Sequence, residues 1–181
     1  LYERVSWEKP DKRLAAKVLE RLYNEADSPL RYRINRLGNR SKQDKWIMQA
    51  ELFNEVHRWI LKSWNTKDPE RITDAAVERR YRVLQEFLRA ARSAWGDAWG
   101  DQKYNVTKPV TLKAMIRVCA DLNAKDSDPD GRERRWTQRL APWGELVREF
   151  RDEGFYERFA AKGQVERVGK VHKYLAAAVR L

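Results

Sequence analysis

The side chains that most often carry chemistry are sparse in this 181-residue sequence, which has two histidines and one cysteine. His57 and His172 fall on or beside apolar helical faces, which favours a packed or partly exposed imidazole over a metal ligand or general base. Cys119 falls on an apolar helical stripe, which is typical of a small core residue. Neither a Walker A loop nor a GxGxxG loop occurs. We therefore expect no catalytic site, no bound metal and no cofactor in this chain.

Basic residues form the second group, and they gather in three clusters whose density suits the neutralisation of nucleic-acid phosphates. The first cluster is Arg31, Arg33, Arg36, Arg40, Lys42 and Lys45, the second is Arg132, Arg134, Arg135 and Arg139, and the third is Lys162, Arg167, Lys170 and Lys173. Within the first cluster Asp44 is the one acidic residue. Trp46 and Trp136 adjoin the first two clusters, where an indole could stack on a base or be buried in the core. The clusters are also compatible with solvated helix faces that bind nothing.

The third cluster also allows a more specific hypothesis, a helix–turn–helix. Residues 155–162 and 164–180 would be its two helices, with Gly163 in the turn. Gln164, Arg167, Lys170 and Lys173 would then face a DNA groove.

The elements that must position these residues are predicted to be helices throughout. Proline at the first helical turn predicts helix starts at Pro10 and Pro109. Apolar residues at steps of three and four predict a helix over 49–64 and a further one that ends at Gly96. Pro69 at the first helical position, with Asp68 as a candidate cap, predicts the start of the latter. Shorter helices are expected over 132–140, 142–152 and 155–162, and a last one from Gln164 carries Val165, Val168, His172, Leu175 and Val179 on one face. No strand pattern of period two appears, so we predict an all-α fold, an irregular bundle of about seven to eight helices.

Composition limits the class of protein. Apolar residues make up 42% of the chain and include eight tryptophans, which predicts a folded core despite the 36% charged content. The formal net charge of +11 favours polyanionic partners, nucleic acid first. A single cysteine excludes an intramolecular disulfide and fits a reducing, cytoplasmic setting. No apolar run approaches the roughly 20 residues that a membrane-spanning helix needs, so no membrane partner is expected.

Several segments together resemble the C-terminal helical part of the DGQHR-domain family, which includes the DndB-type proteins of bacterial DNA phosphorothioation. They are Asp27-Ser28-Pro29-Leu30 with Ile34, the helix over 46–64, the end of the next helix with Trp95 and Trp99, and the segment 107–122. The namesake Asp-Gly-Gln-His-Arg motif is absent. The resemblance implies that this motif lies on a preceding α/β domain of a longer protein. It also implies a bacterial, cytoplasmic context of DNA modification, phage defence or transcription regulation.

These observations predict three regions and a function. Residues 1–122 would form a helical core that resembles the family, 123–131 an exposed loop, and 132–181 a C-terminal helical subdomain packed on that core. We expect a non-catalytic domain that binds the DNA backbone through basic helix faces. The alternative is a protein–protein interaction or oligomerisation module, in which Trp99, Trp136 and Trp143 would contact other subunits of a DNA-modification system. An enzyme would require a pocket that joins His57 or His172 to carboxylates.

Overall fold

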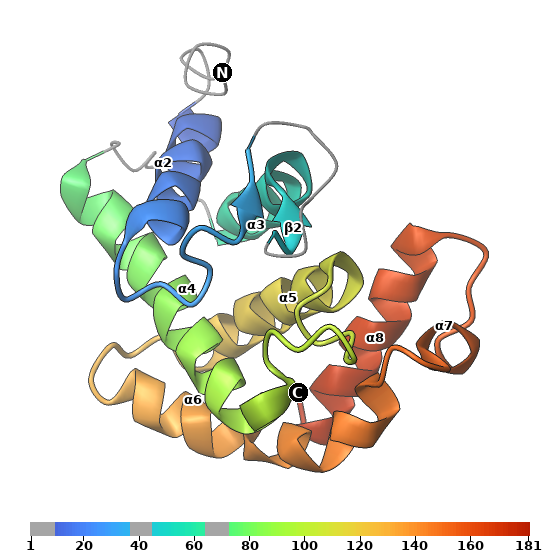
Figure 1. Cartoon of the computed structure of the whole chain (residues 1–181). Helices are drawn as coiled ribbons and strands as arrows, with labels where there is room; N and C mark the ends of the chain where they lie inside the picture. Colours follow the sequence, from blue (N-terminus) through green and yellow to red (C-terminus); the bar gives the residue numbers. More distant parts are fainter. Residues whose placement is uncertain (1–9, 37–44, 64–72) are drawn as a thin grey trace. The chain divides into compact units, whose positions relative to one another are not determined.

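The computed structural model describes residues 10–36, 45–63 and 73–181, with side chains up to Trp59 in the second range. These residues contain seven α-helices, two 3-10 helices and a pair of two-residue strands. The predicted all-α fold is therefore confirmed (Figure 1). The chain divides into two compact units, residues 1–85 and 86–181, and the division falls within helix α4. The expected division at 123–131 stays a prediction of the sequence.

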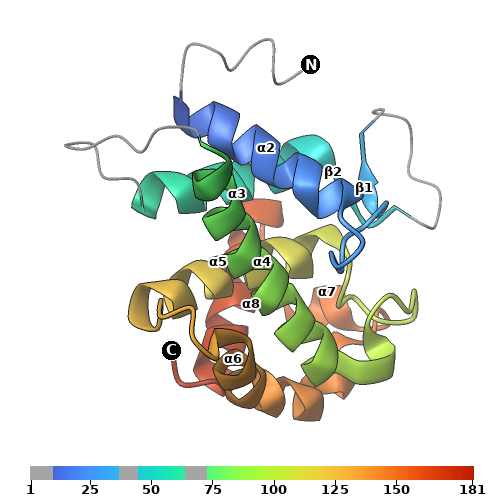
Figure 2. The ribbon, with the colours of Figure 1, turned by 90° about the vertical axis from the view of Figure 1, so that its left-hand side faces the viewer.

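Helices α2 (Pro10–Asn24) and α3 (Gln49–Ser63) pack against each other in the N-terminal unit and lie side by side in Figures 1 and 2. Leu14, Val18 and Leu22 form the buried stripe of α2, whereas Ala26, which the same spacing would place on that stripe, lies beyond the end of the helix and is exposed. Beyond the helix, the Ser28 hydroxyl donates to the Leu22 carbonyl at 2.5 Å and accepts from the Leu30 amide at 3.2 Å. These two hydrogen bonds of the Ser28 hydroxyl stabilise the turn that leads into the first basic cluster.

The strands β1 (Ile34–Asn35) and β2 (Ile47–Met48) pair in parallel, with Ile34 opposite Ile47. Both isoleucines are buried and anchor the chain on either side of residues 37–44, which lie outside the described range. Two residues are too few to show a period of two in a sequence, so this pairing was not predicted.

Helix α4 (Asp74–Trp95) contributes its first half to the N-terminal unit. Tyr81 is buried there, and its hydroxyl donates to Asp27 Oδ1 at 2.5 Å. Burial raises the pKa of Tyr81, so the phenol stays a donor. Glu78 accepts from Arg21 of α2 and, at 2.6 Å, from Arg82 Nε of its own helix, so one ion pair links α2 to α4 and the other lies within α4.

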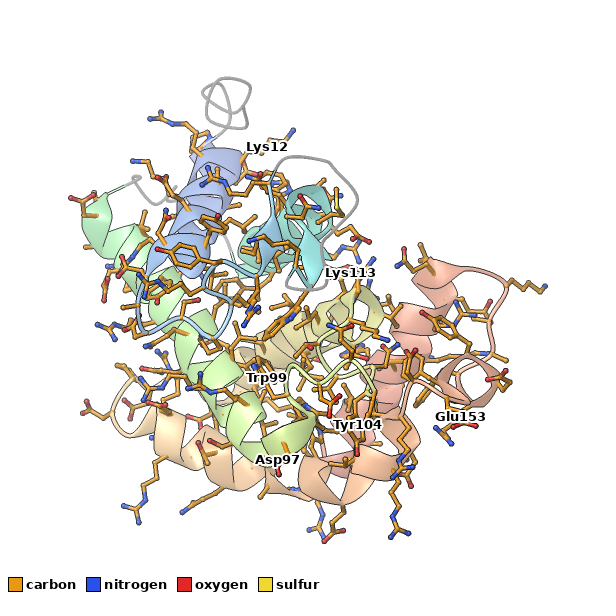
Figure 3. The ribbon with its side chains drawn as sticks, in the orientation of Figure 1. Lys12, Asp97, Trp99, Tyr104, Lys113 and Glu153 are labelled. Atoms are coloured by element: carbon orange, nitrogen blue, oxygen red, sulfur yellow. The ribbon has the colours of Figure 1, made fainter. Side chains whose placement is uncertain are left out.

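The second half of α4 ends at an aromatic corner in the C-terminal unit. Trp95 is 1% exposed and stacks on Trp143 with ring centroids 5.6 Å apart. Gly96 follows at a positive φ of 55°, where glycine avoids the strain of a side chain, and opens the 3-10 helix η1 (Gly96–Ala98). Trp99 and Tyr104 lie in the loop beyond it (Figure 3). The prediction that Gly96 ends this helix is confirmed.

Helices α5 (Pro109–Lys125) and α8 (Gln164–Ala178) make the most extensive helix pair of the C-terminal unit (Figure 1). Cys119 is fully buried on α5, as expected. On α8 the buried stripe is Val168, Val171 and Leu175. The expectation that Val165 shares this face is wrong, because Val165 lies in the first turn of α8 and is 82% exposed.

Three shorter helices complete the C-terminal unit, namely α6 (Arg132–Leu140), η2 (Ala141–Phe150) and α7 (Phe155–Arg158). Helix α6 has the predicted bounds. The segment expected to be helical over 142–152 is instead a 3-10 helix, whose tighter winding brings Gly144 close to the Ala94 carbonyl. A Cβ at Gly144 would lie 3.1 Å from that oxygen. Helix α7 is a single turn, shorter than the expected 155–162.

None of the helices within the described ranges combines the length and apolar character required to cross a membrane.

Candidate nucleic-acid interface

The first basic cluster is positioned by β1 and β2 in the N-terminal unit. Burial of Ile34 and Ile47 fixes the two strands, and the Trp46 amide donates to the Arg33 carbonyl at 2.7 Å. This hydrogen bond joins the residue before β1, Arg33, to the residue before β2, Trp46. Arg31 and Arg36 are exposed, and Arg33 and Lys45 are partly exposed. Arg40 and Lys42 lie outside the described residues.

Each of these four basic side chains lies over an aromatic ring. The Arg31 guanidinium carbon is 4.7 Å from the centre of the Tyr32 ring, and that of Arg33 is 5.0 Å from the centre of the Trp46 ring. Arg36 and Lys45 both lie over Tyr23, at 4.9 and 5.9 Å. Attraction between cations and ring faces holds the charges near the rings without neutralising them. We call Tyr23, Arg31, Tyr32, Arg33, Arg36, Lys45 and Trp46 the basic-aromatic surface.

Tyr23 and Tyr32 are the residues of this surface that sequence reasoning missed. Their rings meet edge to face, with centroids 5.4 Å apart, although Tyr23 belongs to α2 and Tyr32 to the turn before β1. Tyr32 stands between two arginines in the sequence, which is a signal that could have been used. Tyr23 carries no such signal, because its place in the surface depends on how the chain folds back after α2.

The second cluster is largely occupied by contacts within the C-terminal unit. Arg132 is 5% exposed, donates to Glu86 at 2.6 Å and lies over the Trp136 ring. Arg139 donates to the carbonyls of Val179 and Arg180. Arg134 is exposed. The cluster therefore does not present its four charges together, and the buried Arg132 has a structural role in place of the expected nucleic-acid contact.

Arg135 binds the loop that precedes α6. It makes two hydrogen bonds to the Asp126 carboxylate, at 2.9 and 2.7 Å, and donates to the carbonyls of Asp128 and Asp130. These bonds from Arg135 hold the pKa of Asp126 below its ordinary value. Helix α5 extends to Lys125, so the loop begins later than the expected residue 123, and Arg135 and Arg132 both donate to its carbonyls.

In the third cluster, too, some cations bind groups of the C-terminal unit and others are exposed. Arg167 donates to the Phe159 carbonyl at 3.1 Å, and Lys170 donates to the Ala160 carbonyl and to Glu166. Lys173 is exposed. Because α7 is one turn long, the first helix of the expected helix–turn–helix is not formed as predicted.

The two histidines each bind a carboxylate on the helix against which their own helix packs. His57 of α3 lies 2.6 Å from Asp11 of α2, and His172 of α8 lies 2.6 Å from Asp121 of α5. These contacts explain both residues as links between helices. Burial raises the pKa of the Cys119 thiol, which keeps it protonated. The described residues include no group of three side chains arranged to hold a metal ion.

Two of the three tryptophans expected at a protein-binding surface are in the interior. Trp136 and Trp143 are fully buried, and the Trp143 indole donates to the Leu175 carbonyl at 3.0 Å. Trp99 is partly exposed. An interaction surface built on these three residues together is therefore ruled out.

Comparison of the chain with protein-family models, with curated proteins and with solved structures gives no significant match.

Proposed function

We propose that the N-terminal unit binds the phosphate backbone of nucleic acid through the basic-aromatic surface, with little sequence preference. The observation that carries this proposal is the convergence of four cationic side chains on three aromatic rings around β1 and β2. Cations neutralise phosphates, and aromatic rings offer faces on which bases stack. Surfaces that bind nucleic acid without reading its sequence combine the same two features.

The partners of the basic residues differ between the clusters, and this difference favours the first cluster as the binding surface. Arg132 and Arg135 are bound to carboxylates. A phosphate would have to displace those partners. Among the described residues, neither Arg31 nor Arg36 has a carboxylate partner, so a phosphate meets an uncompensated charge there.

The resemblance to DGQHR-domain proteins supplies the setting of the proposal. In that setting the chain is a non-catalytic part of a bacterial, cytoplasmic protein concerned with DNA modification, defence or the regulation of such genes. DNA is then the expected nucleic acid, and other subunits of a modification system are further candidate partners.

Two variants that remove the same charge from different places test the proposal. Arg31→Gln/Arg36→Gln removes two cations from the basic-aromatic surface. Arg134→Gln/Lys173→Gln removes two exposed cations from the second and third clusters. Binding to a fluorescein-labelled 20-base-pair DNA is measured by anisotropy at 0.1 M salt.

We expect the first variant to weaken binding by about tenfold or more, because two phosphate contacts are lost, and the second to change it much less. Equal losses in the two variants would mean that net charge, and not this surface, determines binding. Circular dichroism of both variants checks that the fold is retained.

A further inference from the structure

Tyr32 is an exposed aromatic residue with a strained backbone conformation. Its φ is 59°, in the left-handed region, and its ring is 49% exposed. Glycine and asparagine adopt this conformation readily, but bulky residues rarely do, because their side chains crowd the backbone. Because about half of Tyr32 is exposed, burial offsets less of this strain than it would for a core residue. Strain of this kind concentrates at functional sites.

Contacts to the backbone hold Tyr32 in this conformation. Its amide donates to the Tyr23 carbonyl at 3.0 Å, and Lys45 Nζ donates to its carbonyl at 2.5 Å. The edge-to-face contact with Tyr23 sets the direction of the ring. The position of the ring is therefore fixed before any ligand arrives, which lowers the entropic cost of stacking on it.

Charge around the ring identifies the class of partner. Arg31 lies over Tyr32 and also donates to its hydroxyl at 3.1 Å, while Arg33 lies over Trp46. A guanidinium and an aromatic ring each offer a plane on which a base can stack, and the guanidinium also binds phosphate. A partner that fits must be anionic and must carry exposed flat rings.

We infer that the basic-aromatic surface prefers single-stranded to duplex nucleic acid, with an unpaired base stacked on the Tyr32 ring. This inference rests on the proposed function and adds the substrate class. In a duplex both faces of each internal base are covered by its neighbours, so the Tyr32 ring has nothing to stack on there. In a single strand a base can turn out while its flanking phosphates contact Arg31, Arg36 and Lys45.

The test compares a labelled 20-nucleotide DNA strand of mixed sequence with the duplex that it forms with its complement. Anisotropy is measured across a salt series for the unmodified protein, Tyr32→Asn and Tyr32→Phe. Asparagine tolerates a positive φ, so Tyr32→Asn removes the ring while relieving backbone strain, and thermal unfolding checks that the fold is kept. Phenylalanine keeps the ring and serves as the matched control.

We expect the single strand to bind at least about fivefold more tightly, the lower end for one stacked base. Tyr32→Asn should abolish this preference without changing the salt slope, and Tyr32→Phe should keep it. Equal, steeply salt-dependent binding of strand and duplex would overturn the inference and leave the proposed function standing. A preference that survives in Tyr32→Asn would also overturn it. Salt-independent or absent binding of both probes would refute the proposed function itself.

Discussion

The role of an arginine in this chain depends on which acceptors and rings the fold brings within its reach. Arg132 and Arg31 belong to basic clusters that look alike in the sequence. Arg132 is buried against Glu86, a residue 46 positions away along the chain, whereas Arg31 is exposed over the neighbouring Tyr32 ring. Sequence reasoning recognised the density of charge but could not identify partners that are distant in the chain. The sequence therefore located the exposed Arg31 and Arg36 of the first cluster, but it also counted the buried Arg132 of the second as available.

Replacement of Arg132 by methionine should destabilise the protein by about 3 kcal/mol, because it leaves the carboxylate of Glu86, 17% exposed, without its cation. Chemical denaturation measures this loss. The double variant Arg132→Met/Glu86→Leu should recover much of it, since no charge is then left uncompensated. The control Arg134→Met, at an exposed position, should change stability little. A stable single variant would contradict the structural role of Arg132.

Replacement of Trp95 by alanine should destabilise the fold by about 3–5 kcal/mol, because its ring packs against both Trp143 and Phe150 in the interior. Urea denaturation followed by circular dichroism gives the value. Trp99→Ala, at the partly exposed tryptophan four residues on, is the matched control and should cost less. A neutral Trp95→Ala would show that the corner at the end of α4 is not part of the core.

At the scale of elements, the helices were predictable where a local signal marks them. Pro10 and Pro109 begin α2 and α5 as expected, and steps of three and four along α4 follow its buried face. The expected helix start at Pro69 lies outside the described residues. The sequence did not distinguish the 3-10 helix over Ala141–Phe150 from an α-helix, because its winding follows from packing against the end of α4. The β1–β2 pairing depends on contacts between segments that are distant in the chain, and two residues per strand produce no periodic pattern in the sequence.

The ion pairs of Glu78, with Arg21 of α2 and with Arg82 of its own helix α4, predict how the stability of the fold depends on pH. Hydrogen bonds from Arg21 and Arg82 lower the pKa of Glu78 below its ordinary value of 4.5. A carboxyl whose pKa is lower in the folded state stabilises that state above pH 4.5, and this contribution is lost as pH falls through the lowered pKa.

Urea unfolding midpoints measured from about pH 6 to pH 3 should therefore fall more steeply for the unmodified protein than for Glu78→Gln, which has no proton to bind there. Glu153→Gln, at an exposed loop position, is the control and should leave the slope nearly unchanged. Identical pH profiles for the unmodified protein and Glu78→Gln would show that the Arg21–Glu78 and Arg82–Glu78 pairs do not contribute.

At the scale of the whole molecule, a net charge of +11 does not mean that every basic residue is available to a partner. Arg132, Arg135, Arg139 and Arg167 in the C-terminal unit each serve its own fold. Four basic residues of the N-terminal unit gather around three aromatic rings, and within the described part of the chain two of them, Arg31 and Arg36, have no carboxylate partner. The excess charge attracts polyanions over long range, and the basic-aromatic surface is where we expect them to bind.

The salt dependence of DNA binding tests this central claim most directly. If the four described cations each neutralise a phosphate, the plot of log affinity against log salt should have a slope of about −3.6, with roughly a 150-fold loss between 50 and 200 mM. Arg31→Gln/Arg36→Gln should reduce the slope by about 2, since each lost contact removes about 1. An affinity that stays flat across this range, or a slope that the double variant does not change, would contradict the account.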